Sequence, residues 1–554
     1  MNGLERTQRW TLIAILAVGT AIVTFLFLRN PNIGYDALRY FFAAQNLAQG
    51  KGYSYRGAPE LLFPPGYGVA AYLVSWVVPD PEAALMLVSA LAYVLILLAS
   101  YRVGRALFGA RVGLVAAALT ALSPTLVKYS HVTLSEALFT LLLLVGFGVY
   151  ARASRHAGPG AWTVFGALMG SAYLVRPEAL MVGGLALLRL ALVGAGKGSE
   201  AGSPPCPAAS RAAAVSVAGM VTALFVLPYM FFLHQHLGRW SVSTKLAANL
   251  YLGESLEEGE ARSEYLGWEH PELFEPQHQI DVVEYVRSRG WRFLKRVAGN
   301  GVAVAREVVR GSFHALLPLL ALAGFAVARG FARGIEVARA FLPEARLTWI
   351  FAIFMSPMAV LLFLFVADRF VLPYLPLVLL LCARALVVCH ERWYGSRPGG
   401  AATRWAWIAA GLALVSLLGW LPWVGQKVSL LKVLSTPHAH AGLRSAGLWL
   451  REHAGPMEDR PLMCVRKCDI VLFYAGGKRE PGARYLTVNP SMSIEDVTQA
   501  LERGEADYLV LESNYIVARP RLLPLWKDPG SAERYGLVLV HADERSGFQI
   551  YRAR

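Results

Sequence analysis

The chain has 554 residues, of which 55% are hydrophobic and only 16% are charged, and its mean hydropathy is +0.43. This composition is far from that of an average soluble protein. The apolar residues also form long unbroken runs, which indicate a membrane protein. The net charge of +15 does not indicate nucleic-acid binding, because no basic patch stands apart from the apolar runs.

About eleven apolar runs are long enough, or nearly long enough, to cross a bilayer as helices of ~20 residues. No small-residue cleavage site follows the first run, so we expect it to be retained as a signal anchor. The run 66–78 is an exception: counting it as a span would invert every later loop, so we expect it to be re-entrant or interfacial. The expected spans are 11–28, 83–101, 112–126, 133–151, 161–175, 179–195, 212–235, 311–328, 347–366, 370–388 and 405–424.

The basic residues between these runs predict the orientation of the chain, because loops on the cytoplasmic side carry an excess of Arg and Lys. With the N-terminus inside, the first outer loop is 30–82, the long outer loop is 236–310, and the chain after 426 lies outside. The expected inside loops carry Arg102, Arg105 and Arg111; Arg152 and Arg155; Lys197 and Arg211; Arg329, Arg333, Arg339 and Arg346; and Arg392, Arg397 and Arg404. We therefore expect a multi-pass protein of the cytoplasmic (inner) membrane.

The long outer loop has an acidic first half, and its second half, VVEYVRSRGWRFLKRV, places apolar residues against Arg and Lys at helical spacing. This pattern fits a helix on the membrane surface whose basic side chains reach lipid phosphates. A solvated connecting helix is an equally good interpretation.

The last part of the chain has soluble character. Its patterns predict helices near 440–453 and 493–503, strands at 461–465, 485–488 and 508–512, and a hairpin over 537–552. Cys464 and Cys468 fall here, either as an extracytoplasmic disulfide, which would need a turn or helix between them, or as plain thiols. No Cys and His spacing indicates a zinc site. The sequence thus predicts an α-helical polytopic membrane protein (1–426) with a small extracytoplasmic α/β domain (427–554).

Ionisable groups at the outer ends of the spans are the candidate functional residues, because a charge in lipid is costly unless it is paired or used. Acids among several cations suit transfer from a phosphate-linked donor: cations hold the phosphate as it leaves, and a carboxylate accepts the proton of the attacking group. Four groups meet on this side: Asp36 with Arg39 and Tyr40; Lys128, Tyr129, His131 and Glu136; Arg176 and Glu178 on either side of Pro177; and Asp368 with Arg369.

Each candidate also has a structural explanation that needs no chemistry. Glu136 is harder to explain in this way, since it lies about one turn inside its span. The structural alternatives are a salt-bridged helix cap for Arg176 and Glu178, an interfacial anchor pair for Asp368 and Arg369, a hydrogen-bonded boundary residue for His131, and a snorkelling side chain for Lys128.

Several short motifs carry a resemblance to a known family. They are DALRY at 36–40, PPGY at 64–67, SPTLVKYSHVTLSEAL, YLVRPEAL, STKLAANLYLGES at 243–255 and DRFVLPYLP. In this order the motifs resemble the GT-C superfamily of integral-membrane glycosyltransferases, in particular the family 39-like branch that includes protein O-mannosyltransferases and the lipid A aminoarabinose transferase. The resemblance covers most of residues 1–390. In the family a second acid usually follows the Asp, whereas this chain has Ala37.

The resemblance implies a sugar donor on a polyprenyl phosphate, with no nucleotide sugar used directly. It makes Asp36 the catalytic base and assigns the donor phosphate to Arg39, Lys128, Arg176 and Arg369. Tyr40, Tyr129, His131, Glu136, Glu178, Asn249 and Tyr251 are further site candidates. The missing second acid leaves a divalent cation neither required nor excluded, and no cofactor is indicated. No GxxxxGK[ST] or strand-borne GxGxxG is present, as expected when the lipid-phosphate bond stores the energy.

The resulting hypothesis is an inverting glycosyltransferase that acts on the extracytoplasmic face, with the bilayer, a lipid-linked donor and an acceptor (protein, lipid or glycan) as partners. A lipid-linked sugar flippase is the alternative from another class, although transporters often have paired repeat halves, which this sequence lacks. A ligase or polymerase of lipid-linked glycans is a second alternative. The chain lacks the Trp-Trp-Asp motif of oligosaccharyltransferases, which argues against transfer of whole glycans to asparagine.

Overall fold

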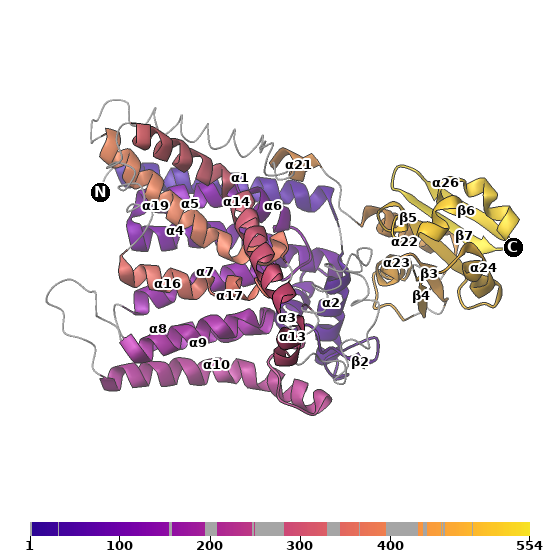
Figure 1. Cartoon of the computed structure of the whole chain (residues 1–554), viewed down its shortest axis with the longest axis horizontal. Helices are drawn as coiled ribbons and strands as arrows, with labels where there is room; N and C mark the ends of the chain where they lie inside the picture. The colour runs from indigo at the N-terminus through magenta and orange to yellow at the C-terminus, as the bar shows by residue number, and fades with distance from the viewer. Residues whose placement is uncertain are drawn as a thin grey trace.

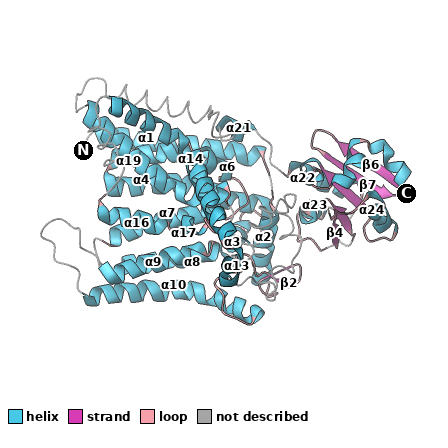
Figure 2. Cartoon of the chain, viewed as in Figure 1, coloured by secondary structure: helices cyan, strands magenta, loops and turns pink. Residues whose placement is uncertain are grey.

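The computed structural model consists of a bundle of long helices and, at one end of it, a small β-sheet flanked by short helices (Figures 1 and 2). The chain between them, from α2 (Tyr35–Ala48) to α3 (Gly66–Ser75), lies at the end of the bundle that faces the sheet. The described residues are 3–154 except 32, 158–193, 208–245, 249, 282–328, 344–394 except 365, and 430–554 except 436–439, 456, 458–459, 483 and 490.

The helices of the bundle form where the sequence has apolar runs. Among the described residues, five helices are long and apolar enough to cross a membrane: Arg6–Arg29, Pro81–Phe108, Glu136–Ala153, Ala209–Leu237 and Asp368–Val388. The bounds are α1 Gly3–Arg29, α4 Pro81–Phe108, α5 Ala110–Ala121, α6 Pro124–Tyr129, α7 Glu136–Ala153, α8 Pro159–Val175, α9 Glu178–Val193, α10 Ala208–Leu237, α13 Val282–Arg289, α14 Trp291–Ala328, α16 Ala345–Met355, α17 Pro357–Val360, α18 Asp368–Val371, η3 Leu372–Tyr374 and α19 Leu375–Tyr394.

Three expected spans differ from the structure. The span expected at 112–126 is divided, because α5 ends at Ala121 and a separate short helix, α6, begins at Pro124. The span expected at 347–366 is interrupted, because α16 ends at Met355 and a separate short helix, α17, begins at Pro357. The span expected at 311–328 is the last part of a 38-residue helix, α14, which begins at Trp291 directly after Gly290. The basic segment before the span is therefore continuous with it from Trp291 on. The span expected at 405–424 lies outside the described residues.

The first outer loop contains two helices and a small hairpin. Strands β1 (Ser54–Tyr55) and β2 (Ala58–Pro59) are joined by Arg56 and Gly57, both with positive φ, as a two-residue turn of type I′ requires. Helix α3 has 10 residues and is about 15 Å long, too short to cross ~30 Å of hydrocarbon. It packs closely on α2 because a Cβ on Gly68 would lie 2.0 Å from the Tyr40 carbonyl oxygen.

Helix α2, which contains Asp36, is largely buried. In α2 the side chains of Ala37, Leu38 and residues 40–44 are buried, and Phe42 contacts the ring of Phe473 in the C-terminal part of the chain. Both faces of the helix are therefore used, one against the bundle and one against the C-terminal segment.

The C-terminal segment (441–554) is built on a five-stranded sheet of order β4-β3-β5-β7-β6. Strands β3, β4 and β5 are parallel, and β5, β7 and β6 are antiparallel. Cys464 and Cys468 are both buried free thiols, so the disulfide is not formed. The elements from residue 430 on are α21 Leu430–Ser435, α22 Ala441–His453, β3 Leu462–Cys464, α23 Cys468–Ala475, β4 Tyr485–Thr487, α24 Ile494–Glu502, β5 Tyr508–Glu512, α25 Ser513–Ile516, η4 Pro520–Leu522, α26 Leu523–Lys527, η5 Pro529–Tyr535, β6 Leu537–Asp543 and β7 Phe548–Ala553.

Polar contacts dock the C-terminal segment on the start of α4. The hydroxyl of Tyr474 donates to Glu82 at 2.6 Å, and Lys478 forms ion pairs with Asp80 and, at 2.7 Å, with Glu82. Burial acts to lower the pKa of Lys478, but hydrogen bonds to Asp80 and Glu82 outweigh it and raise this pKa. The segment is thus held against the same end of the bundle as α2.

Candidate functional site

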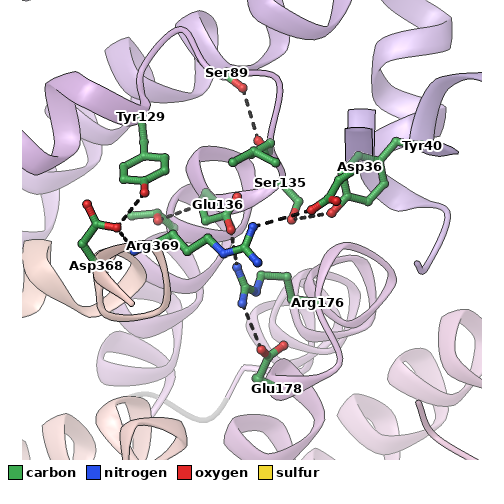
Figure 3. Close-up of polar contacts among 12 residues, drawn as sticks. Asp36, Tyr40, Ser89, Tyr129, Ser135, Glu136, Arg176, Glu178, Asp368 and Arg369 are labelled. Carbon is green, nitrogen blue, oxygen red and sulfur yellow. Dashed lines mark hydrogen bonds and ion pairs between the residues drawn. The ribbon is translucent and has the colours of Figure 1, made fainter. Parts of the chain in front are cut away.

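Four carboxylates lie in the first turn of four helices near the end of the bundle. Asp36 is the second residue of α2, and Glu136, Glu178 and Asp368 are the first residues of α7, α9 and α18. The partial positive charge of a helix N-terminus stabilises an anion there, which explains why acids are tolerated at these positions. Figure 3 shows the four side chains around two guanidinium groups, those of Arg176 and Arg369.

Arg176 joins two of these carboxylates. Pro177 disfavours helical geometry at the residue before it, and Arg176 has an extended conformation (φ −150, ψ 129) that ends α8. Its guanidinium donates to Glu136 at 3.0 Å and to Glu178 at 3.1 Å, and its side chain is only 7% exposed. One carboxylate oxygen of each acid remains buried without a described partner, so both acids keep acceptor capacity.

Arg369 joins the group to Asp36. Its Nη1 lies 3.6 Å from Asp36 Oδ2, an ion pair longer than a charge-assisted hydrogen bond of ~2.8 Å. Within the described residues Asp36 has no closer polar partner, and its side chain is 16% exposed. The carboxylate is thus partly accessible and has free acceptor positions.

The neighbouring acid, Asp368, has different hydrogen-bond partners. It accepts hydrogen bonds from Lys128 at 2.6 Å and from the Tyr129 hydroxyl at 2.8 Å. Lys128 is about half exposed. The predicted groups around Asp36, Glu136, Arg176 and Asp368 thus come together, although they lie as far as 332 positions apart in the sequence.

Lys245 is a further cation of this site that the sequence reasoning did not select. Its Nζ lies 4.4 Å from the centre of the Phe63 ring, and no ion pair with a described carboxylate holds it. Burial and the nearby Arg176 guanidinium lower the pKa of Lys245 to about 8, against the opposing effect of Glu178 and Asp36. Its only sequence signal is its position in the STKLAANLYLGES motif, which directed attention to Asn249 and Tyr251 instead.

Arg39 has a partner outside this group. Its Nε donates to Glu60 at 2.5 Å, and the Glu60 side chain is fully buried. The other oxygen of Glu60 accepts from the backbone amides of Leu62 and Phe63. Arg39 and Glu60 therefore fix the end of the first outer loop, in an arrangement that the spacing of the two residues did not reveal.

The remaining predicted residues differ in their placement. Tyr40 is buried against Phe63 and Tyr67, with its hydroxyl 3.5 Å from the Ser135 hydroxyl. Burial lowers the pKa of His131 to about 4, and no described hydrogen bond or ion pair links this neutral imidazole to the carboxylates. Asn249 is half-buried, and Tyr251 lies outside the described residues.

A metal site is not formed by the side chains that the structure describes: no three His, Cys, Asp or Glu residues among them gather closely enough. The acids of the site are instead neutralised by Arg and Lys. Such a set of cations and carboxylates suits a phosphorylated ligand and proton transfer.

Comparisons with known proteins give one family-model match and several matches to solved structures. Residues 63–217 match the family model described as dolichyl-phosphate-mannose-protein mannosyltransferase. A comparison with curated protein sequences finds no significant match. The fold is nevertheless similar, over almost the whole chain, to solved membrane glycosyltransferases of the GT-C type, so the resemblance predicted from the motifs is confirmed.

Solved structures of two proteins are similar in fold to this chain. ArnT from Cupriavidus metallidurans in the apo state has a TM-score of 0.57 and 13% identity, covering 99% of this chain and 98% of that chain. The same protein bound to undecaprenyl phosphate has a TM-score of 0.54 and 14% identity, covering 97% of each chain. The oligosaccharyltransferase AglB from Archaeoglobus fulgidus, in complex with an inhibitory peptide and a dolichol-phosphate, has a TM-score of 0.50 and 13% identity, covering 99% of this chain and 74% of that chain.

Proposed function

We propose that this protein transfers a sugar from a polyprenyl-phosphate donor to an acceptor on the extracytoplasmic face of the inner membrane. The observation that carries this proposal is the Asp36 carboxylate, which is partly accessible and lies 3.6 Å from Arg369 beside the Arg176 pair. Support for the donor class comes from ArnT, which is similar in fold and has been solved with undecaprenyl phosphate.

In the proposed reaction, Asp36 accepts the proton of the acceptor hydroxyl or amine. The acceptor atom forms a bond to the anomeric carbon, and the bond between that carbon and the phosphate oxygen breaks. Polyprenyl phosphate leaves with the electron pair, and the configuration at the anomeric carbon inverts. The negative charge that develops on the phosphate is stabilised by nearby cations, for which we select Arg369, Arg176, Lys245 and, at the more exposed edge, Lys128.

The loose Asp36–Arg369 pair fits this sequence of events. A donor phosphate that binds Arg369 would compete with Asp36 for the guanidinium, and Asp36 would then be free to accept a proton. The resemblance implies a phosphate role for Arg39, but Glu60 holds its guanidinium at 2.5 Å, so we propose that Arg39 positions the loop instead.

The test is release of polyprenyl phosphate by the purified protein in detergent, from a panel of polyprenyl-phosphate sugars with a cell-envelope extract as acceptor source. Asp36→Asn keeps the shape of the side chain and removes the base, and we expect it to lower turnover about 10²–10⁴-fold. Asp507→Asn, at an exposed acid of the C-terminal segment, is the matched control and should retain wild-type turnover.

Equal turnover by wild type and Asp36→Asn would contradict the base assignment, and Glu136 and Glu178 would then be tested in the same way. If wild type consumes no donor, the flippase alternative becomes the better explanation. That alternative predicts equal lipid-linked sugar flux in vesicles for wild type and Asp36→Asn.

A further inference from the structure

A cavity of about 780 Å³ lies at the C-terminal end of α2, away from the cluster of acids and cations. Three parts of the chain line it: the first outer loop with its β1–β2 hairpin, the last turns of α10, and the loop 480–482 of the C-terminal segment. The volume lies within the range of ligand-binding pockets in proteins, ~300–1,000 Å³. Nothing in the reaction proposed above uses this cavity.

The inner wall of the cavity is linked to the charged cluster through Phe63. Tyr53, which lines the cavity, donates from its hydroxyl to the Phe63 carbonyl at 2.8 Å, and the Phe63 ring is in contact with Lys245. Along α2 the distance from Asp36 to Asn46 is about 15 Å, at 1.5 Å per residue. A molecule that reaches both places must therefore span about this distance.

The walls of the cavity are fixed by contacts between the C-terminal segment and the hairpin. Glu480 accepts from the Arg56 backbone amide at 2.6 Å and from the Asn46 amide. The Arg56 side chain donates to Asp469 at 2.6 Å. Burial raises the pKa of Asp469, against the opposing effect of Arg56. These contacts hold the strained, positive-φ conformation of Arg56 and keep the cavity preformed.

The lining favours a saccharide over a peptide. Peptides that add to a sheet need a free strand edge, but the Ser54 carbonyl on β1 already accepts from Asn46 at 2.9 Å, and Pro59 on β2 lacks an N–H donor. The ring of Phe232 is partly exposed and is packed between Tyr229 and His236. The exposed imidazole of His236, which packs on this ring, offers an aromatic surface beside amide and carboxylate groups, and such a surface suits the C–H face and the hydroxyls of a sugar ring.

We propose that this cavity binds the sugar chain of a glycan acceptor, whose terminal hydroxyl reaches Asp36. This acceptor role rests on the glycosyl transfer proposed above and adds to it the class of the acceptor. The C-terminal segment thereby contributes one wall of the acceptor site through Glu480, Pro481 and Gly482.

The test is retention of fluorescently labelled molecules by the full-length protein in detergent. Two pools are prepared from the cell envelope of the source organism, one of released saccharides and one of tryptic peptides. We expect wild type to retain saccharides, and Phe232→Ala with His236→Ala to reduce retention at least tenfold. Phe231→Ala, at the exposed neighbour on α10, is the matched control and should retain them like wild type. Gel-filtration profiles show whether each variant is folded.

Asp36→Asn separates this proposal from the proposed reaction. If it retains saccharides, binding is independent of the base, and a failure of turnover then concerns the reaction alone. Retention of peptides instead of saccharides would overturn the glycan class. Retention of neither pool by wild type, or equal saccharide retention by the folded double variant, would overturn the site.

Discussion

We predict a pH dependence of kcat/KM that distinguishes a Lys245 that binds the donor phosphate from a Lys245 with a structural role alone. The pKa of Lys245 is about 8, so the ammonium is present below this pH and is lost as the pH rises through it. If this ammonium binds the donor phosphate, kcat/KM, which reports the free enzyme, falls about tenfold for each pH unit above ~8. A lysine with an ordinary pKa of about 10.4 would keep its charge through this range.

Two substitutions of Lys245 give the expected size of the change in kcat/KM and of the shift in its pH dependence. Lys245→Met removes the charge, and a hydrogen bond to a charged group contributes about 1.5–3 kcal/mol, so we expect kcat/KM to fall roughly 10- to 150-fold below pH 8. Lys245→Arg keeps the charge at high pH and should move the alkaline limb upward by two units or more.

The assay is a pH series of polyprenyl phosphate release, with the donor identified by the Asp36 experiment and at donor concentrations below KM. Lys527→Met, at a lysine of the C-terminal segment, is the control and should leave the limb near 8. An alkaline limb that is unchanged in Lys245→Arg would refute the assignment, since the titrating group would then be another residue.

Three further predictions concern the framework of the site. Glu60→Gln leaves Arg39 without its charged partner and should lower the free energy of unfolding by about 3 kcal/mol, seen as a lower thermal unfolding midpoint in detergent; an unchanged midpoint would contradict the buried pair. Lys478→Met should increase hydrogen exchange in the peptide 466–482, because Glu82, 2% exposed, loses its cationic partner and, among the described side chains, keeps only the Tyr474 hydroxyl; equal exchange would show that the docking does not depend on Lys478. A reductant should leave the midpoint unchanged, since Cys464 and Cys468 are free thiols; a decrease would show a disulfide.

The sequence predicted the members of the charged cluster better than their partners. Asp36, Glu136, Arg176 and Arg369 are predicted because each lies at or within about one turn of the expected outer end of an apolar run, and helices of similar length bring such positions to one level. The individual contacts depend on packing between helices. Arg176 was expected to pair locally with Glu178, and it also bridges to Glu136 on a different helix.

Lys245 and Glu60 could not be found in the same way, because neither stands at the end of an apolar run. Their roles arise from tertiary contacts: Thr244 donates to the Leu61 carbonyl at 2.8 Å, which brings the following lysine onto Phe63, and Glu60 becomes buried only when α2 and the hairpin fold over it. Alternation of apolar and polar residues also predicted the strands of the C-terminal sheet, but not that this segment would bury one face of α2.

Arg39 follows Asp36 in the sequence motif, and Arg369 lies near Asp36 in space. The two arginines show why a motif alone does not assign roles. Arg39 lies one turn from Asp36 and would be the obvious phosphate ligand, but a fully buried carboxylate holds it at 2.5 Å, and breaking such a pair is costly. Arg369 is 333 positions away, yet it meets Asp36 through a loose contact of 3.6 Å that a phosphate could replace at little cost. A cation that must exchange partners during a reaction is expected to have a weak partner in the free enzyme, and by this criterion we propose Arg369 as the phosphate ligand and Arg39 as part of the framework.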